Sequence, residues 1–279
     1  MVLLRQKFVT IMNTRDLLLA LVASLTFSNC AEDVEKLAQP YLTRAQESYA
    51  NKQYALAKLQ IDSIKEVYPK AFETRTQAQA LFIEVELAEA RTGKHYTDSL
   101  LAEAQDKATT LAAALYLDKD VQYQDYGTYY AARHRTEKNV GKSYLRPQTD
   151  ERGVFTITTF YRGRAIGSQI LRFTAPDDSF IEFQPTAEPY IMSDATGRTE
   201  RTDFAATPDL AHFVSMHPSL KVTLIGAERK AQIPINKNDI QALIQVAELA
   251  ATLQAITNLQ TEQQELIRRI TFYEQRQAQ

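Results

Sequence analysis

The side chains best suited to metal binding and acid–base chemistry are the four histidines, which are scattered along the chain as His95, His134, His212 and His217. Only the last two lie close together, but a spacing of five does not put both on one helical face, and Pro218 interrupts the stretch. The sequence contains no His-Glu-x-x-His motif and no histidine–carboxylate pair at the spacing of a zinc site. We therefore expect no metal centre and no cofactor.

Other catalytic motifs are also missing from the sequence. Gly163 and Gly167 are not followed by the strand-to-helix transition with Lys and Ser or Thr that a phosphate-binding loop needs. No Gly-x-Ser-x-Gly elbow occurs, and Asp177 and Asp178 lie in a segment typical of a turn. These patterns favour a protein without catalytic activity. An extracytoplasmic hydrolase with a site in the β region stays open, because carboxylates can converge from distant positions.

Cys30, the single cysteine, indicates a different chemistry. It follows a short apolar stretch, Leu17–Phe27, which is itself preceded by basic residues at positions 5, 7 and 15. A bacterial lipoprotein signal peptide has the same order: a basic region, an apolar core, small residues and a cysteine. The stretch is too short for a membrane-spanning helix, which requires roughly 20 residues. We therefore predict a signal peptide over residues 1–29, with Met12 as an alternative start, and a membrane anchor through lipidated Cys30.

Acidic residues follow the cysteine at Glu32, Asp33 and Glu35. In this respect Leu17–Glu35 resembles the lipoproteins of Bacteroidota-type envelopes. The resemblance implies a cell-envelope protein that is lipid-anchored to the outer membrane and faces the periplasm or the exterior. A purely local role is the alternative, because acidic side chains near a helix start interact favourably with the helix dipole.

Composition limits the remaining choices. The chain has 279 residues and a formal net charge of −2, which argues against a nucleic-acid partner because such proteins normally carry a basic face. Once Cys30 carries a lipid, no thiol is left for a disulfide or a nucleophile. An ordinary hydrophobic core must therefore stabilise the mature chain, whose length suits one large domain or two small ones.

Residues 30–118 favour helices, because glycine is rare and apolar residues recur at spacings of three and four. Tyr41–Pro69 resembles a single tetratricopeptide repeat, and the residues that match its spacing are Ala45, Tyr54, Ala57, Ile61, Ile64 and Pro69. The two alanines allow two antiparallel helices to approach closely around the turn Asn51–Gln53, and the proline ends the second helix. One repeat is too few for a superhelical peptide groove.

Two further helices are expected before the β region. One covers Phe72–Thr92 and ends at Gly93, as helices often do. The next begins near Thr97 and carries an apolar stripe over Leu100–Leu115.

Residues 119–235 favour an antiparallel β domain, because β-branched and aromatic residues alternate with polar ones between short turn signals. The expected strands are Tyr126–Arg133, Lys142–Arg146, Val154–Tyr161, Gln169–Ala175, Phe180–Gln184, Thr199–Ala205, Leu220–Ile225 and Arg229–Ile233. No helix is expected between them, which makes a doubly wound nucleotide-binding fold improbable.

The last segment, residues 236–279, favours one long helix with Asn236 or Asn238 as its N-cap and Asp239 in its first turn. Its near-heptad apolar positions are Leu249, Ile256, Leu259, Leu266, Ile270 and Tyr273. We expect this helix to pack back on the N-terminal helices; a homodimeric coiled coil is the alternative. The predicted fold class is α+β, with N-terminal helical hairpins, a central antiparallel β region and the long C-terminal helix.

Taken with the lipid anchor, these features resemble Bacteroidota-type lipoproteins with a tetratricopeptide-like hairpin, and the resemblance implies no particular reaction. We expect a non-enzymatic envelope protein that binds a protein or glycan partner or serves as a structural module. The expected contact surface is made of turns at Asp150–Gly153, Asp177–Ser179 and Asp194–Arg198, with Phe160, Tyr161 and Tyr190 nearby as exposed aromatic residues. A hydrolase and a cytoplasmic helical scaffold are the alternatives.

Overall fold

The computed structural model describes residues 34–194 and 197–278, and within them the chain is α+β. The described residues form five α-helices and two antiparallel sheets, which confirms the predicted fold class. They divide into two compact units. Unit 1 contains residues 34–95 and 264–278, and unit 2 contains 96–194 and 197–263. Cys30 and the predicted signal peptide lie outside the described residues.

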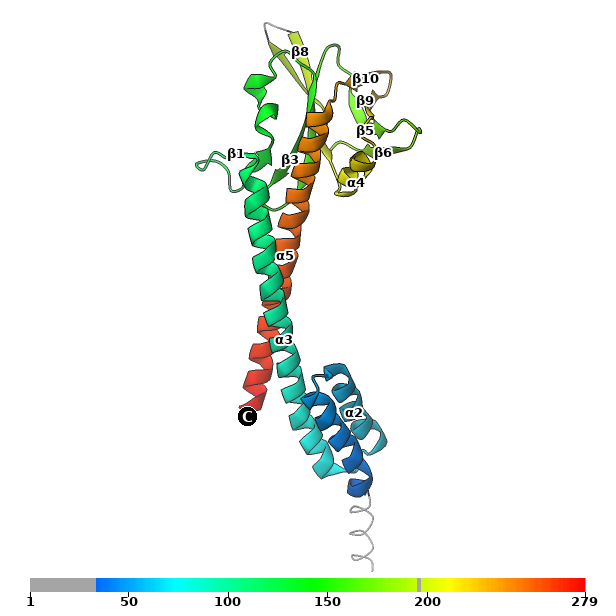
Figure 1. Cartoon of the computed structure of the whole chain (residues 1–279), viewed down its shortest axis with the longest axis vertical. Coiled ribbons are helices and arrows are strands. Elements are labelled where there is room, and N and C mark those ends of the chain that lie inside the picture. The colour runs from blue at the N-terminus through cyan, green and yellow to red at the C-terminus, as the bar shows by residue number, and fades with distance from the viewer. Residues whose placement is uncertain (1–33, 195–196, 279) are drawn as a thin grey trace, which may run out of the picture. The chain divides into compact units, whose positions relative to one another are not determined.

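Unit 1 begins with the antiparallel hairpin that the sequence predicts. A helix over residues 34–50 is followed by α2 (Tyr54–Val67), and the two helices lie side by side in blue in Figure 1. Ala45 and Ala57 are completely buried, as expected for small residues at a close helix contact. Lys52 takes a positive φ of 59°, which lets the chain reverse direction within the short turn.

α3 (Phe72–Ala113) is one continuous helix of 42 residues that contributes to both units. The prediction of two helices separated at Gly93 is therefore wrong. Gly93 does not adopt a positive φ, so it is not a helix-ending glycine. A Cβ placed there would lie 3.2 Å from a methyl carbon of Leu266, which shows that the glycine allows a close approach of α5 (Lys237–Gln277) within unit 1.

The long C-terminal helix, α5, packs against α3 in each unit, which confirms that prediction. In unit 1 the rings of Phe82 and Tyr273 meet edge to face, with centroids 6.4 Å apart. In unit 2 Lys107 Nζ lies 2.9 Å from a carboxylate oxygen of Glu248. A heptad-spaced series of α5 positions is buried or half-buried: Leu249, Thr252, Ile256, Leu259, Gln263, Leu266, Ile270 and Tyr273.

Part of α5 is long and apolar enough to cross a membrane by length and composition alone. Leu243 and Val246 in this helix are buried in the core of unit 2, and 39% of the apolar stretch is buried within the protein.

Unit 2 contains both sheets, and every strand pair in them is antiparallel. The larger sheet has the order β1 (Tyr116–Asp118), β2 (Thr128–Tyr130), β3 (Tyr144–Asp150), β4 (Phe155–Arg162), β8 (Gly197–Ala205) and β7 (Tyr190–Asp194). The smaller sheet has the order β10 (Lys230–Ile233), β9 (Lys221–Gly226), β5 (Ser168–Thr174) and β6 (Phe180–Phe183).

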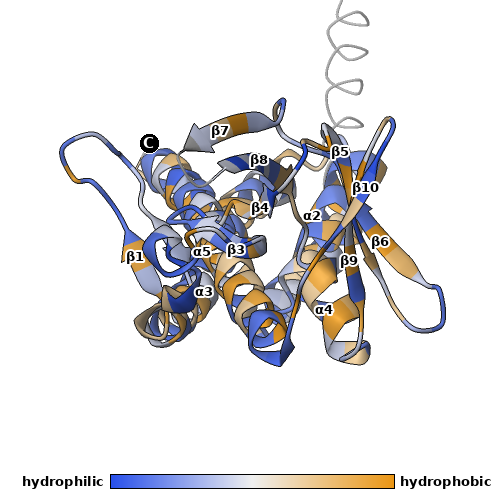
Figure 2. Ribbon diagram, turned by 90° about the horizontal axis from the view of Figure 1, so that it is seen from above, coloured by the Kyte–Doolittle hydropathy of each residue, from blue (hydrophilic) through white to orange (hydrophobic). Residues whose placement is uncertain are grey.

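The core of unit 2 joins the two sheets, the short helix α4 (Asp209–Met216) and the first half of α5. Its largest completely or almost completely buried apolar side chains are Leu145, Ile157, Leu171, Phe173, Phe204, Leu210, Leu224, Leu243 and Leu249. Figure 2 shows α4 largely in the orange of apolar residues. Burial of this kind supplies about 1.5–3 kcal/mol for each large apolar side chain.

Three elements of unit 2 differ from the prediction. β1, β7 and α4 were not expected, and α4 contradicts the expectation that no helix interrupts the β region. The strand predicted over Tyr126–Arg133 is confined to β2, and two 3₁₀ turns follow it, η1 (Ala132–His134) and η2 (Thr136–Lys138).

Candidate functional site

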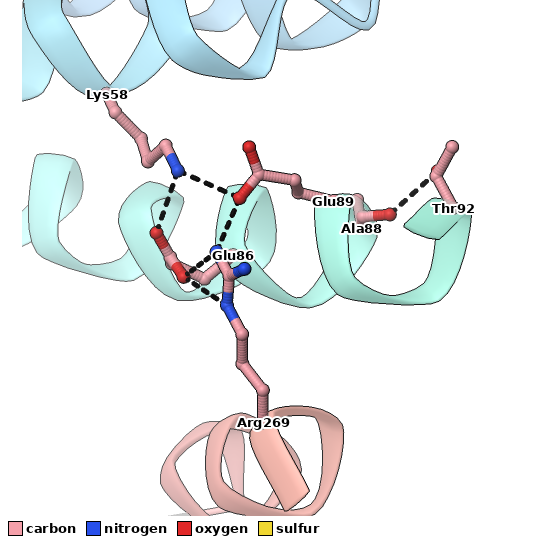
Figure 3. A network of polar contacts seen from close by, with 6 residues as sticks. All are labelled: Lys58, Glu86, Ala88, Glu89, Thr92 and Arg269. Atoms are coloured by element: carbon pink, nitrogen blue, oxygen red, sulfur yellow. Dashed lines mark hydrogen bonds and ion pairs between the residues drawn. The ribbon is translucent and has the colours of Figure 1, made fainter. Parts of the chain in front are cut away.

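The strongest ionic cluster lies in unit 1 and joins α2, α3 and α5 (Figure 3). Lys58 Nζ lies 3.2 Å from Glu86 Oε1 and 2.8 Å from Glu89 Oε2, and Arg269 Nε donates to Glu86 Oε2 at 2.9 Å. Arg269 also contacts Glu89. Burial lowers the pKa of Lys58, but the two carboxylates raise it more, so the ammonium is retained. Because each partner is bound to another, this cluster joins helices and offers no free acid or base.

A second buried carboxylate, Glu200 on β8, connects the two sheets of unit 2. Its Oε2 accepts the backbone N–H groups of Ile166 at 2.6 Å and Gly167 at 3.0 Å. Its Oε1 accepts the N–H of Ser168 at 3.0 Å and the Ser168 hydroxyl at 2.5 Å. Burial raises the pKa of Glu200, but these hydrogen bonds lower it more, so the net shift is downward. The carboxylate is therefore ionised and fully engaged in structure.

His134 and Asp239 form a buried pair that brings η1 to the start of α5. His134 Nε2 lies 2.9 Å from Asp239 Oδ1, and Arg133 approaches the same oxygen at 3.3 Å. Burial raises the pKa of Asp239, but the hydrogen bond from His134, the N–H of Asn236 and the charge of Arg133 lower it more. The sequence places these two residues 105 positions apart, so their spacing gave no signal of the pair.

Asp239 is positioned by a reciprocal capping box at the N-terminus of α5. Its Oδ2 accepts the N–H of Asn236 at 3.0 Å, while Asn236 Oδ1 accepts the N–H of Asp239 at 3.2 Å and that of Asn238 at 2.9 Å. Of the two N-caps that the sequence left open, the structure selects Asn236. The cap fixes one carboxylate oxygen of Asp239 and leaves the other directed at His134.

A cavity of about 410 Å³ surrounds this pair. It lies among the 3₁₀ turns, the start of β3 and the connection from β10 to α5, and its side chains carry three cations and one carboxylate. Its lining residues with polar or charged side chains are Arg133, His134, Lys138, Asn139, Lys142, Ser143, Tyr144, Asn236 and Asp239. The arrangement is basic and rich in hydrogen-bond donors.

The loops predicted to form a contact surface differ in their surroundings. In Asp150–Gly153, a Cβ on Gly153 would lie 2.6 Å from the backbone oxygen of Ala250, so this turn packs directly on α5. Asp177–Ser179 is exposed and is closed by a hydrogen bond from the Ser179 hydroxyl to Asp177. Asp194–Arg198 lies partly outside the described residues.

The aromatic residues expected beside these loops are also not equivalent. Phe160 is buried and stacks on Tyr144 with ring centroids 4.5 Å apart, so the expectation that it is exposed is wrong. Tyr161 is half-buried. Tyr190 is exposed as expected, and it begins β7, an edge strand that the sequence did not predict.

β7 is paired on one side only, with β8, and lies at an edge of the larger sheet. Its first three side chains are large and exposed: Tyr190 by 65%, Ile191 by 38% and Met192 by 36%. The apolar part of β7 is visible in orange in Figure 2. An edge strand with exposed apolar side chains is a template for pairing with another chain.

Unit 1 has a groove of about 510 Å³ between α2 and α3, lined in part by Ile61, Lys65 and Arg75. Phe72, at the start of α3, also lines it and is 71% exposed. This groove is the helical counterpart of the β7 edge as a candidate contact surface.

No protein-family model, curated protein or solved structure matches this chain.

Proposed function

We propose that this chain is a non-enzymatic lipoprotein of the bacterial cell envelope, anchored to the outer membrane through Cys30, and that unit 2 binds a protein partner. The exposed apolar edge of β7 is the observation that carries the binding part of this proposal. The partner contributes an extended segment that pairs with β7 and continues the larger sheet. Main-chain hydrogen bonds supply affinity in this mode of recognition, and side-chain contacts supply specificity.

β7 fits this role better than the other three sheet edges of unit 2. β1 has only three residues, and β10 begins with the charged Lys230, a common protection against strand addition. On β6 the exposed ring of Phe180 is covered by the guanidinium of Arg172, 4.7 Å from its centroid. β7 presents three consecutive large side chains, none of them basic.

A photocrosslinking pair tests the interface in intact cells. Tyr190 and Tyr96 are each 65% exposed, so a photoreactive phenylalanine at either position replaces an aromatic residue of matched accessibility. We expect specific adducts from position 190 but not from position 96, and their loss when Ile191→Glu and Met192→Glu are added. Adducts of equal yield at both positions, or adducts that survive the two glutamates, contradict an interface at β7.

The lipid anchor is tested separately by metabolic labelling with a fatty-acid analogue. The expected result is labelling of the wild-type chain, its loss in Cys30→Ala and sensitivity of processing to globomycin. Labelling that persists in Cys30→Ala contradicts lipidation at this residue, and an unlabelled wild-type chain favours the cytoplasmic scaffold.

The hydrolase alternative requires carboxylates that are free to exchange protons beside a substrate. Glu200 and Asp239 are instead bound at both oxygens, as described above. This engagement supports structural roles for these two carboxylates.

A further inference from the structure

We propose that the cavity around His134 binds a small oxyanion, the carboxylate or phosphate group of a soluble ligand. The site is separate from β7 and does not depend on the proposed interface. Three kinds of observation point to it: the balance of charge, two buried polar atoms without partners, and the supply of donors.

The charge of the cavity is basic. Arg133, Lys138 and Lys142 line it, whereas Asp239 is the single carboxylate among its lining residues. Asp239 is itself partnered by His134 and by Arg133. The two lysines thus remain as positive charges that no carboxylate of the cavity balances, which favours an anion and disfavours a metal cation.

Two buried polar atoms without partners are found on residues that line this cavity. Among the described residues, four buried side-chain nitrogen or oxygen atoms have no hydrogen-bond partner of ordinary geometry, and two of the four are His134 Nδ1 and Tyr144 Oη. The side chain of Thr136 lies near Tyr144 Oη and lowers the pKa of Tyr144, so His134 Nδ1 is the clearer of the two cases. His134 is only 3% exposed, and its other nitrogen is engaged by Asp239. A buried polar group that lacks a partner is unfavourable, because it has lost its hydrogen bonds to water. A ligand that accepts hydrogen bonds from both groups removes this cost.

Both groups belong to residues that line the cavity and can hydrogen-bond with a ligand there. His134 Nε2 is engaged by Asp239, so Nδ1 is the ring nitrogen that remains to hydrogen-bond with a ligand. Burial raises the pKa of Tyr144, so its phenol keeps its proton. Ser143 Oγ accepts the N–H of Arg162 at 2.9 Å, which leaves its own hydroxyl hydrogen free to donate. An oxyanion offers several lone pairs and can accept from these groups together.

The His134–Asp239 pair alone has a simpler explanation, in which it only attaches η1 to α5. That explanation uses Nε2 and leaves Nδ1 without a partner, and it does not explain the two lysines of the cavity, of which Lys142 donates only to the backbone oxygen of Lys138 at 3.5 Å. The two accounts therefore predict different effects for variants that leave the pair intact.

Calorimetric titration of the full chain with inorganic phosphate and with acetate provides the test, because the two probes separate phosphate from carboxylate selectivity. We expect saturable binding of at least one probe and about tenfold weaker binding in Lys138→Gln/Lys142→Gln. Both lysines are exposed, so the melting temperature should not change. Lys221→Gln/Lys230→Gln removes two exposed lysines elsewhere in unit 2 and is the matched control.

His134→Gln tests the buried donor. The glutamine amide nitrogen can take the place of Nε2 and donate to Asp239, but glutamine has no group in the position of Nδ1. We expect weaker binding in this variant, and in the wild type a shift of the His134 Nδ1 resonance on adding the probe. Equal binding by the wild type and both lysine variants would identify an adventitious ion only. That result, an unmoved Nδ1 resonance or no saturable binding overturns the proposal.

Discussion

Replacing Glu200 with glutamine should destabilise unit 2 far more than its small change in shape suggests. The carboxylate accepts four hydrogen bonds from Ile166, Gly167 and Ser168. A glutamine oxygen in the place of Oε2 can still accept the first two N–H groups. Its NH2 group would face the N–H of Ser168, although the Ser168 hydroxyl can rotate to accept from it. One buried N–H thus loses its acceptor.

The magnitude follows from this count of donors. One buried unsatisfied N–H costs about 1–3 kcal/mol, and the two retained hydrogen bonds lose the strength that an ionised acceptor gives them. We expect Glu200→Gln to lower the free energy of unfolding by about 2–4 kcal/mol. For a protein of roughly 150–250 residues, this loss corresponds to a fall in melting temperature of about 5–15 °C. The chain has no tryptophan, so urea unfolding is best followed by circular dichroism or tyrosine fluorescence.

The effect should also depend on pH. The folded pKa of Glu200 is lowered, so its stabilising contribution is present above the unfolded pKa of about 4.3 and is lost as pH falls through the folded pKa. The difference between wild type and Glu200→Gln should therefore shrink in acid. Faster amide exchange at Ile166, Gly167 and Ser168 locates the damage. Glu228→Gln, at an exposed glutamate of the same unit, is the control, and equal midpoints for the two variants refute the reasoning.

Three further substitutions probe other contacts, and for each we expect a decrease in the free energy of unfolding measured with denaturant. Arg269→Met removes a partner from the buried Glu86 of α3 and should lower the free energy of unfolding by about 1–3 kcal/mol. Arg268→Met, at an exposed neighbouring position, should leave it almost unchanged. Gly153 and Gly141 both have a positive φ, but only at Gly153 would an added Cβ clash with α5. Gly153→Ala should therefore lower the free energy of unfolding by more than Gly141→Ala, which should lower it by about 1 kcal/mol. Glu35→Gln weakens a helix cap and should cost about 1 kcal/mol above pH 5 but less in acid, since hydrogen bonds lower the pKa of Glu35. Equal losses within either pair, or no pH dependence for Glu35→Gln, contradict these assignments.

The sequence predicted elements whose periodicity extends over many residues. The heptad spacing of α5 is maintained from Leu249 to Tyr273, and the strand predicted over Val154–Tyr161 differs by one residue at each end from the observed β4, Phe155–Arg162. Short elements were missed for the same reason. α4 has two buried apolar side chains, Leu210 and Val214, and one such pair cannot be distinguished from strand alternation in a segment of eight residues.

Gly93 shows how a local signal can be misread when its cause is tertiary. Glycine after a helical stretch commonly ends the helix by adopting a positive φ. Here it remains helical, and its missing side chain makes space for Leu266 on α5. The packing partner lies more than 170 positions away in the sequence, so neither spacing nor composition could distinguish the two roles.

The buried polar groups were the least predictable part of the molecule, because their partners come from distant segments. His134 and Asp239 meet across 105 positions, and Glu200 meets Ser168 across 32. The one detectable signal was local: Asn236 or Asn238 as N-cap and Asp239 in the first turn predicted the start of α5. That signal identified the helix end but not the histidine that the same carboxylate binds.

The acidic residues after Cys30 have two explanations, a signal for surface display and a local interaction with a helix start, and the contacts of Glu35 bear on the second. Its carboxylate accepts the N–H groups of Glu73 and Thr74, each at 3.0 Å, and the Thr74 hydroxyl at 2.6 Å. It therefore caps α3, a helix other than its own, so its charge has a structural role. In the proposed lipoprotein we expect a surface-display signal after Cys30 to rest on Glu32 and Asp33, so exchanging those two residues for their amides should alter display. Changing Glu35 should instead lower the stability of unit 1.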